Sequence, residues 1–260
     1  MNTVKAKKYL GQHFLNDTGI ASRIADTMDD FRHLPILEIG PGMGVLTQFL
    51  IKKNLNLKVI EIDGESVTYL KDKYPLLNII QGDFLKISID HISTDKKEFC
   101  IIGNYPYNIS SQIFFKVLEW KDSIPCVSGM LQKEVAERIA SPAGKKSYGI
   151  LSVLLQAWYD IEYLFTVPPE VFTPAPKVYS GVIKLTRNRR TELGCNENNF
   201  KNIVKTAFNQ RRKVLRNSLQ TLFGKNSEFY DMKIFSLRPE QLSVEGFIEL
   251  TKLYESTLSE

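Results

Sequence analysis

The sequence predicts an α/β protein, in which a mostly parallel sheet covered by helices on both faces is followed by a small all-helical region. Three observations predict it. Short apolar runs alternate with amphipathic segments up to about residue 185, an order typical of βα units. A glycine-rich turn follows the first buried run. After residue 186, the remaining apolar periodicity is helical.

The expected elements can be placed in order. The parallel strands are five apolar runs: Ile36–Ile39, Lys58–Ile62, Leu77–Ile80, Phe99–Ile102 and Cys126–Leu131. The amphipathic segments are Thr18–Met28, Leu46–Lys53 and Ser66–Lys73. Two later runs, Ile161–Val167 and Val178–Leu185, flank a proline-rich stretch, which fits a closing antiparallel hairpin better than another crossover.

The C-terminal part of the chain is expected to form a separate domain. Helical periodicity covers Phe200–Phe208, Val214–Phe223 and Val244–Leu258, and Ser243 is a plausible N-cap for the last helix. We therefore expect one domain over residues 1–190 and a helical domain over residues 191–260.

Composition excludes several classes of protein. A chain of 260 residues with 43% hydrophobic residues can bury a substantial core, so a disordered protein is not expected. The longest apolar run, Tyr148–Tyr159, is too short for a membrane span and is expected to be a buried helix. The basic N-terminus lacks the apolar segment of a secretory signal. Three scattered cysteines, with no C-x-x-C pair, predict no metal site and a reducing, cytoplasmic location.

Basic residues are concentrated in one part of the chain. Residues 177–225 contain 12 basic and 2 acidic residues, a net charge of +10, whereas residues 226–260 contain 3 basic and 7 acidic residues, a net charge of −4. Such a block suggests a face that binds a polyanion. A solvated helical surface explains the charge equally well at this point.

A glycine turn follows the first strand. Gly40, Gly42 and Gly44 would let the backbone approach a ligand and expose N–H groups at a helix N-terminus. Glu61 follows Gly40 by 21 residues, a spacing that places a carboxylate where it can hold two ribose hydroxyls. Val45 occupies the sixth position of the pattern, where a nicotinamide-binding turn has glycine. A tight turn without a ligand remains the alternative for the glycines alone.

Polar residues also end the next two strands. Asp83 lies 22 residues after Glu61, and Asn104 lies 21 residues after Asp83. The carboxyl ends of parallel strands share one edge, where ligands bind in open sheets. Asp83 is therefore expected to accept a hydrogen bond from the adenine amino group of a cofactor, although a lone Asp at a strand end is usually a helix cap.

The tetrapeptide Asn104-Tyr105-Pro106-Tyr107 resembles the (D/N/S)-P-P-(Y/F/W) motif of amino-group methyltransferases, in the N-x-P-Y form of RNA adenine enzymes. The Asn104 oxygen would accept a hydrogen bond from N6 of adenine and localise its lone pair for in-line attack on a methyl sulfonium. Tyr107 would offer a ring face to the base, so Tyr107→Phe is expected to be tolerated. In isolation, such a tetrapeptide more commonly closes a strand.

Further segments resemble the KsgA-type small-subunit rRNA adenine dimethyltransferase family, from about residue 5 to residue 250. They are Tyr9–Leu15 (YLGQHFL), Leu131–Val135 (LQKEV), Phe172–Val178 (FTPAPKV), Ala207–Lys213 (AFNQRRK) and Leu215–Asn217 (LRN). The last two resemble the family's basic C-terminal helix, in which Arg212 and Arg216 would share one face.

The resemblance implies a Rossmann-like class I methyltransferase sheet with a small helical RNA-binding domain. It implies N6,N6-dimethylation of two adjacent adenosines in the 3′-terminal hairpin of small-subunit rRNA, with S-adenosylmethionine as cofactor, by a cytoplasmic monomer acting on a pre-small-subunit particle during ribosome biogenesis. The implied cofactor contacts are His13, Leu15, Gly40, Gly42, Glu61, Asp83 and Asn104. The implied catalytic residues are Asn104, Tyr107 and Phe172, with Phe172 lining the target-base pocket, and the implied RNA contacts are Arg211, Arg212, Lys213 and Arg216.

Departures from the family pattern are small. His13 stands where many members have Asn, so its cofactor contact is expected through the backbone or the imidazole. Tyr105 replaces a common Leu, and Ala175 replaces a common Pro.

Two alternative functions remain. One is an adenine N6-methyltransferase of large-subunit rRNA, of the erythromycin-resistance type. The other is a non-catalytic RNA-binding assembly factor, which would be expected to lack Glu61, Asp83 or Asn104.

Overall fold

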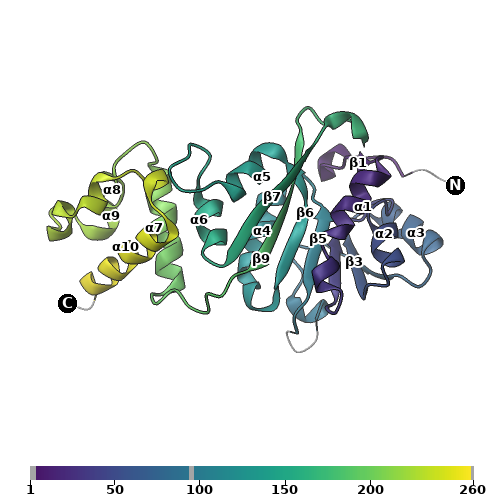
Figure 1. Ribbon diagram of the computed structural model, residues 1–260, viewed down its shortest axis with the longest axis horizontal. Coiled ribbons are helices and arrows are strands. Elements are labelled where there is room, and N and C mark those ends of the chain that lie inside the picture. Colours follow the sequence, from purple (N-terminus) through teal and green to yellow (C-terminus); the bar gives the residue numbers. More distant parts are fainter. Residues whose placement is uncertain (1–3, 94–96, 259–260) are drawn as a thin grey trace. The chain divides into compact units, whose positions relative to one another are not determined.

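The computed structural model describes residues 4–93 and 97–258 and divides the chain into two compact units (Figure 1). The first unit consists of Met1–Glu137 and Asp160–Arg187, and the second of Arg138–Tyr159 and Asn188–Glu260. The second unit therefore includes residues 138–159, which the sequence analysis placed in the first domain. The physical reason is packing, because helix α6 (Ile150–Gln156) buries its apolar side chains against helices α7 and α10.

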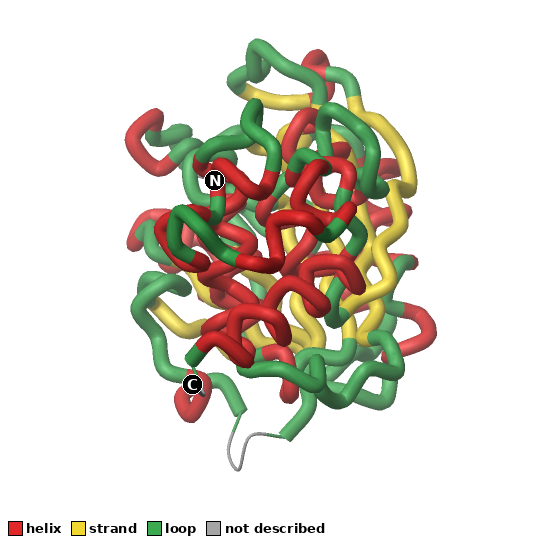
Figure 2. The backbone as a smooth tube through the Cα atoms, turned by 90° about the vertical axis from the view of Figure 1, so that its left-hand side faces the viewer, coloured by secondary structure: helices red, strands yellow, loops and turns green. Residues whose placement is uncertain are grey.

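A seven-stranded sheet, in the order β4-β3-β2-β5-β6-β9-β7, forms the centre of the first unit. Its parallel strands are β2 (Ile36–Ile39), β3 (Leu57–Glu61), β4 (Asn78–Gln81), β5 (Cys100–Asn104) and β6 (Cys126–Gln132). Strand β9 (Ser180–Arg187) runs antiparallel to β6, and β7 (Tyr159–Val167) lies beside β9. Figure 2 shows these strands in one layer with helices against it. The prediction of a parallel α/β sheet with an antiparallel closing strand is confirmed.

Helices lie between the strands in the chain. Helix α1 (Thr18–Asp26) precedes β2, α2 (Thr47–Lys52) and α3 (Gly64–Lys73) follow β2 and β3, and α4 (Ser110–Glu119) and α5 (Lys133–Ala140) follow β5 and β6. Helix α1 begins where the Asp17 side chain accepts a hydrogen bond from the Ile20 N–H at 2.9 Å, which satisfies one free donor of the first turn. Its apolar positions Ala21, Ile24 and Ala25 are fully buried, so the 3.6-residue periodicity seen in the sequence corresponds to the face packed in the core.

A small second sheet joins distant parts of the first unit. Strand β1 (Phe14–Leu15) pairs antiparallel with β8 (Phe172–Thr173), with Leu15 opposite Phe172. The N-terminal segment is thereby held next to the segment that precedes β9. Short 3-10 helices complete the described chain: η1 (Lys8–Leu10), η2 (Asp29–Phe31), η3 (Ile89–His91), η5 (Lys121–Ser123), η6 (Pro169–Val171), η7 (Glu228–Asp231), η8 (Lys233–Ser236) and η9 (Pro239–Gln241).

The second unit is helical. Besides α6, it contains α7 (Glu197–Asn209), α8 (Leu215–Ser218), α9 (Gln220–Phe223) and α10 (Val244–Thr257). The predicted cap of α10 is confirmed, because the Ser243 hydroxyl accepts from the Gly246 N–H at 3.2 Å. The expected single helix over Val214–Phe223 is wrong, because the backbone leaves the helical region at Leu219, where φ is −102° and ψ is 6°. No helix within the described residues is long and apolar enough to cross a membrane.

Candidate active site

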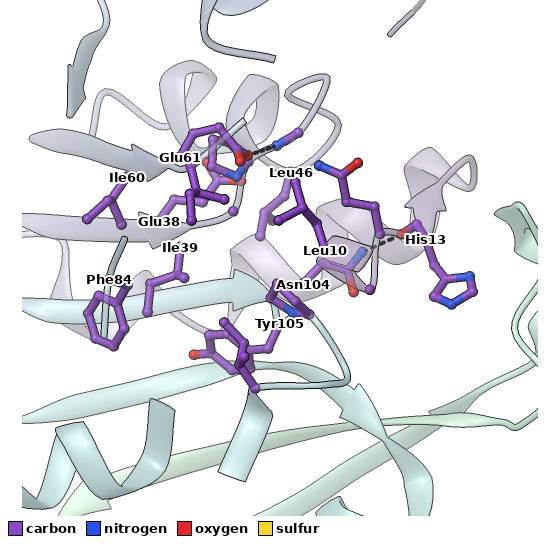
Figure 3. Close-up of a pocket in the computed structure, with 18 of the residues that line it drawn as sticks. Leu10, His13, Glu38, Ile39, Leu46, Ile60, Glu61, Phe84, Asn104 and Tyr105 are labelled. Carbon is purple, nitrogen blue, oxygen red and sulfur yellow. Dashed lines mark hydrogen bonds between the residues drawn. The ribbon is translucent and has the colours of Figure 1, made fainter. Parts of the chain in front are cut away.

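A cavity lies where the parallel strands of the first unit end (Figure 3). Its lining comes from the glycine turn after β2, the end of β3, the residues after β4, the tetrapeptide at the end of β5 and the segment around β1. The polar residues that end successive strands in the sequence thus lie along one edge of the sheet. Eight of the predicted site residues line this cavity: His13, Leu15, Gly40, Gly42, Glu61, Asp83, Asn104 and Tyr107. Within the described residues, there is no cluster of side chains suited to a metal ion.

Glu61 connects the end of β3 to the glycine turn. One carboxylate oxygen accepts from the Gly42 N–H at 3.1 Å, and the other accepts from the Asp63 N–H at 2.9 Å. Burial raises the pKa of Glu61, and these backbone donors lower it in part. Each carboxylate oxygen can accept more than one hydrogen bond. Glu61 therefore both fixes the turn and keeps acceptor capacity toward the cavity.

Gly42 lies in close contact with the N-terminal segment. Its φ is 54°, and an added Cβ would lie 2.8 Å from Cε1 of Phe14. Both the left-handed backbone and the contact with the ring exclude a side chain here. The glycine turn is thus held between the Glu61 carboxylate on one side and strand β1 on the other.

Glu38 is a cavity residue that was not among the site residues predicted from the sequence. It lies in β2, is 1% exposed, and accepts a hydrogen bond from the Thr47 hydroxyl at 2.7 Å. Burial raises the pKa of Glu38 to about 8, and the nearby charge of Glu61 adds to this increase. The sequence contained a signal, namely an acid inside an otherwise apolar strand just before the glycine turn.

Asp83 lies in the turn after β4 and faces the same cavity. Its Oδ1 accepts from the Leu85 N–H at 2.9 Å, so the side chain closes the turn that follows β4 rather than capping a helix. Its other oxygen lies 3.7 Å from the Lys86 ammonium, in a partly exposed pair. Phe84 lines the cavity beside it, and the Phe84 ring is packed edge-on against Trp120 at 5.5 Å. The site here combines a polar acceptor with an apolar wall, a combination suited to an aminopurine ring.

The orientation of the Asn104 amide is fixed by the protein. Its Nδ2 donates to the carbonyl oxygen of His13 at 3.1 Å, a bond drawn in Figure 3. A carbonyl can only accept, so this bond identifies which end of the amide is nitrogen. The Asn104 oxygen consequently remains as an acceptor at the cavity wall.

Tyr105 fixes the tetrapeptide to strand β6. It is 1% exposed, its N–H donates to the Met130 carbonyl at 2.8 Å, and its hydroxyl donates to the Ser128 carbonyl at 2.7 Å. An added Cβ on Gly129 would lie 2.7 Å from the Tyr105 ring, so glycine makes room for it. The replacement of a common Leu by Tyr therefore buries a hydroxyl that has its own acceptor.

Tyr107 is partly buried and contacts two other elements. Its ring stacks on the His13 imidazole, with ring centres 5.2 Å apart and planes 29° apart. Its hydroxyl is hydrogen-bonded to the Ser180 hydroxyl, and His13 Nδ1 donates to the Pro174 carbonyl at 2.7 Å. The carbonyl and Nδ1 of His13 thus both bond to protein atoms. The expectation that Tyr107→Phe is tolerated is revised, because the phenol has a specific partner.

Phe172 is not among the residues that line the cavity, although its strand partner Leu15 is. It is 3% exposed and belongs to the apolar cluster of the first unit. Its pairing with Leu15 across the small sheet explains this burial. Its role in a target-base pocket stays a prediction.

Comparison with known proteins identifies the family. A family model described as ribosomal RNA adenine dimethylase matches residues 3–251. The chain belongs to this family. It is 62% identical to the ribosomal RNA small subunit methyltransferase A of Parabacteroides distasonis, over 99% of this chain and 97% of that protein. It is 61% identical to the protein of the same name from Porphyromonas gingivalis, over 98% of this chain and 100% of that protein.

Solved structures confirm the fold class of the rRNA adenine dimethylase. A dimethyladenosine transferase from Plasmodium falciparum has a TM-score of 0.79 at 23% identity, covering 94% of this chain and 98% of that one. The 23S rRNA methyltransferase ErmE has a TM-score of 0.67 at 25% identity, covering 92% of this chain and 99% of that one. The predicted Rossmann-like class I methyltransferase fold is confirmed, and the chain is an enzyme of the rRNA adenine dimethyltransferase class.

The four basic residues of the dimethylase that are predicted to contact RNA lie in the second unit, but not on one helix. Helix α7 ends at Asn209, so Arg211, Arg212 and Lys213 lie in the following turn, while Arg216 lies in α8. The expectation that Arg212 and Arg216 share a helical face is wrong, because the extended backbone of Val214 separates them. Arg212, Lys213 and Arg216 are exposed.

Arg211 differs from its neighbours. Its guanidinium donates to the Lys146 carbonyl, and its Nε lies 3.7 Å from a Glu240 oxygen. It is only partly exposed. Much of its hydrogen-bonding capacity is therefore used within the second unit.

Proposed function

We propose that this enzyme transfers methyl groups from S-adenosylmethionine to N6 of two adjacent adenosines in the 3′-terminal hairpin of small-subunit rRNA. The observation that carries the proposal is the Asn104 amide, whose nitrogen is bound by the His13 carbonyl and whose oxygen is left for a donor at the cavity. The names of the curated relatives, small subunit methyltransferases at about 60% identity, support the choice of subunit.

The cavity residues fit the proposed cofactor. Glu61 offers a carboxylate for a ribose diol, Asp83 an acceptor for the adenine amino group, and Phe84 an apolar wall for the ring. The glycine turn supplies a close backbone approach. When bound, S-adenosylmethionine supplies a methyl group on a positively charged sulfur. We expect Glu61 and Asp83 to hold it and Asn104 to lie at its reactive end.

The chemistry of Asn104 follows from its free oxygen. A hydrogen bond from N6 to Oδ1 draws the amino hydrogen away, localises the nitrogen lone pair and becomes stronger as positive charge grows on N6. The new N–C bond forms as the S–C bond breaks, and N6 then loses a proton. N6-methyladenine still has one N–H for Asn104, whereas the dimethylated base has none. The same acceptor can therefore serve two transfers and no third.

The substrate context is inferred from charge and loop chemistry. Arg212, Lys213 and Arg216 are expected to bind phosphates without reading sequence, and Arg211 to contribute less. Unstacking an adenosine from a hairpin loop costs less free energy than unstacking one from a duplex. We infer a monomeric enzyme that acts in the cytoplasm on a pre-small-subunit particle.

The test uses purified ribosomal subunits that lack this modification. The protein is incubated with isotope-labelled S-adenosylmethionine and either small or large subunits, and the modified nucleosides are mapped by mass spectrometry. We expect two adjacent N6,N6-dimethyladenosines in the small-subunit hairpin. Label confined to the large subunit would favour the ErmE-like alternative, and particle binding without transfer would favour an assembly factor. Either result would overturn the proposal.

A further inference from the structure

Ser180 lies directly behind the tetrapeptide without lining the cavity. It is the first residue of β9, pairs with Gln132 of β6 and is fully buried. Its hydroxyl is hydrogen-bonded to the hydroxyl of Tyr107, 73 residues earlier in the chain. A buried hydroxyl that loses its partner is costly, so the two side chains constrain each other.

We propose that Ser180 is a positioning residue of the methyl-transfer reaction, which holds the Tyr107 ring in the orientation that receives the target adenine. The inference rests on the proposed function, because it assigns the free face of Tyr107 to the RNA base. Ser180 acts only through Tyr107, since it lies outside the cavity lining.

The Tyr107 ring is held from three directions. Its backbone follows Pro106, whose fixed φ limits the path of the turn. The His13 imidazole covers one face, and that imidazole is itself tied to the Pro174 carbonyl. Ser180 holds the phenol at the tip of the ring. Tyr107 also lines the cavity, and the face opposite His13 is the one that we assign to a single flat base.

The hydrogen bond to Ser180 limits a motion that the other contacts leave open. Rotation about the Cα–Cβ bond swings the whole ring, and a contact on one face still allows the ring to swing away from it. A partner at the tip of the ring resists this swing with the longest lever arm. Burial raises the pKa of the Tyr107 phenol, and the bond to Ser180 lowers it in part, which agrees with a direct interaction of the two hydroxyls.

The first experiment compares Ser180→Ala with Ser180→Thr, which keeps a hydroxyl. Ser152→Ala is the matched control, because Ser152 is equally buried but lies in α6 of the second unit, where its hydroxyl donates to the Arg138 carbonyl at 2.5 Å. In single-turnover transfer to small subunits, Ser180→Ala should be roughly tenfold slower, the effect of one buried hydrogen bond. Ser180→Thr should recover most of the rate, and Ser152→Ala should match wild type. The dissociation constant for S-adenosylmethionine should be unchanged in all three.

A double-mutant cycle then tests the pair itself. Tyr107→Phe removes the same bond from the other side, so Ser180→Ala with Tyr107→Phe should be no slower than the slower single variant. As a readout independent of activity, 3-fluorotyrosine at position 107 should change its fluorine NMR line in Ser180→Ala and keep it in Ser152→Ala. Failure of wild type to methylate small subunits would refute the function. With an active wild type, an unchanged rate in Ser180→Ala, or additive effects in the cycle, would overturn the inference about Ser180 alone.

Discussion

The cavity of the first unit and the basic turn of the second unit hold their polar groups in opposite ways. Glu61 and Asn104 are each fixed by backbone groups, Glu61 by two N–H donors and Asn104 by a carbonyl. Arg212, Lys213 and Arg216 are exposed and form no ion pair within the described part of the chain. Fixed groups can favour one geometry of a reaction, whereas mobile surface cations provide attraction that salt can screen. Changes in the cavity should therefore alter chemistry, and changes in the turn should alter affinity.

The largest effect is expected at Asn104. Asn104→Ala should slow methyl transfer by roughly 100- to 1,000-fold, by analogy with the loss of one preorganised partner of a transition state. RNA affinity should change little, because the bond strengthens during the reaction rather than on binding. Single-turnover rates at saturating cofactor measure this effect. A near-normal rate would show that another group activates N6 and would break the contrast between the two regions.

The buried Glu38 carboxyl should make the free energy of unfolding depend on pH. Its folded pKa of about 8 lies above the ordinary value of 4.5, so the folded protein holds this proton more tightly than the unfolded chain does. The resulting stability is fully present below the ordinary pKa of 4.5 and is lost as pH rises from there through about 8. Between pH 6 and pH 9, wild type should lose about 3 kcal/mol of unfolding free energy relative to Glu38→Gln. Urea titrations at both pH values that moved in parallel would contradict this.

Glu61 is expected to have a smaller effect, confined to the cofactor. Glu61→Ala should weaken S-adenosylmethionine binding by about 1.5–3 kcal/mol, because charge-assisted hydrogen bonds are lost and the Gly42 N–H loses its acceptor. Glu61→Gln keeps one acceptor oxygen and should be intermediate. Isothermal titration calorimetry gives both values, with circular dichroism to establish that each variant is folded. Unchanged affinity in a folded Glu61→Ala protein would remove this residue from the site.

The smallest effect is expected from the basic turn. Reversing Arg212 and Arg216 to Glu should weaken binding to small subunits by about tenfold at low salt and reduce the salt dependence, while cofactor affinity stays constant. Lys233→Glu with Lys252→Glu is the matched control, since it makes the same change in net charge at exposed positions outside the basic segment. If the control variant lost as much affinity, net charge rather than this turn would explain the binding.

The sheet and its functional edge were predictable from the sequence for a definite reason. The inner parallel strands β2, β3, β5 and β6 are largely buried, so each appears as an apolar run, and the shared carboxyl edge of the sheet brings Glu61, Asp83 and Asn104 together. The glycines and the tetrapeptide then narrow the chemistry. These signals are local in the sequence. Few chain topologies can join such strands into one sheet, so the arrangement of the sheet is also predictable.

The features that were missed depend on contacts between distant residues. Nothing in the local sequence ends α7 at Asn209, because no Gly or Pro interrupts the basic residues that follow. Helix α6 lies between strands β6 and β7 in the sequence, and only its packing on α7 and α10 assigns it to the second unit. The partner of the Tyr107 hydroxyl is equally invisible, since a serine at the start of a strand has no signature of its own.

The bond between the Asn104 amide and the His13 carbonyl has a consequence for substrate entry. An amide has two chemically different ends, and turning it over would set two carbonyl oxygens against each other. A carboxylate in the same place would have no hydrogen to give. The Asn104 side chain therefore has a single orientation. Its donor nitrogen is bonded to the protein, and its acceptor oxygen is presented to the substrate. An arriving amino group meets an oxygen already facing it, so no rearrangement of this side chain is needed before the first transfer or between the two.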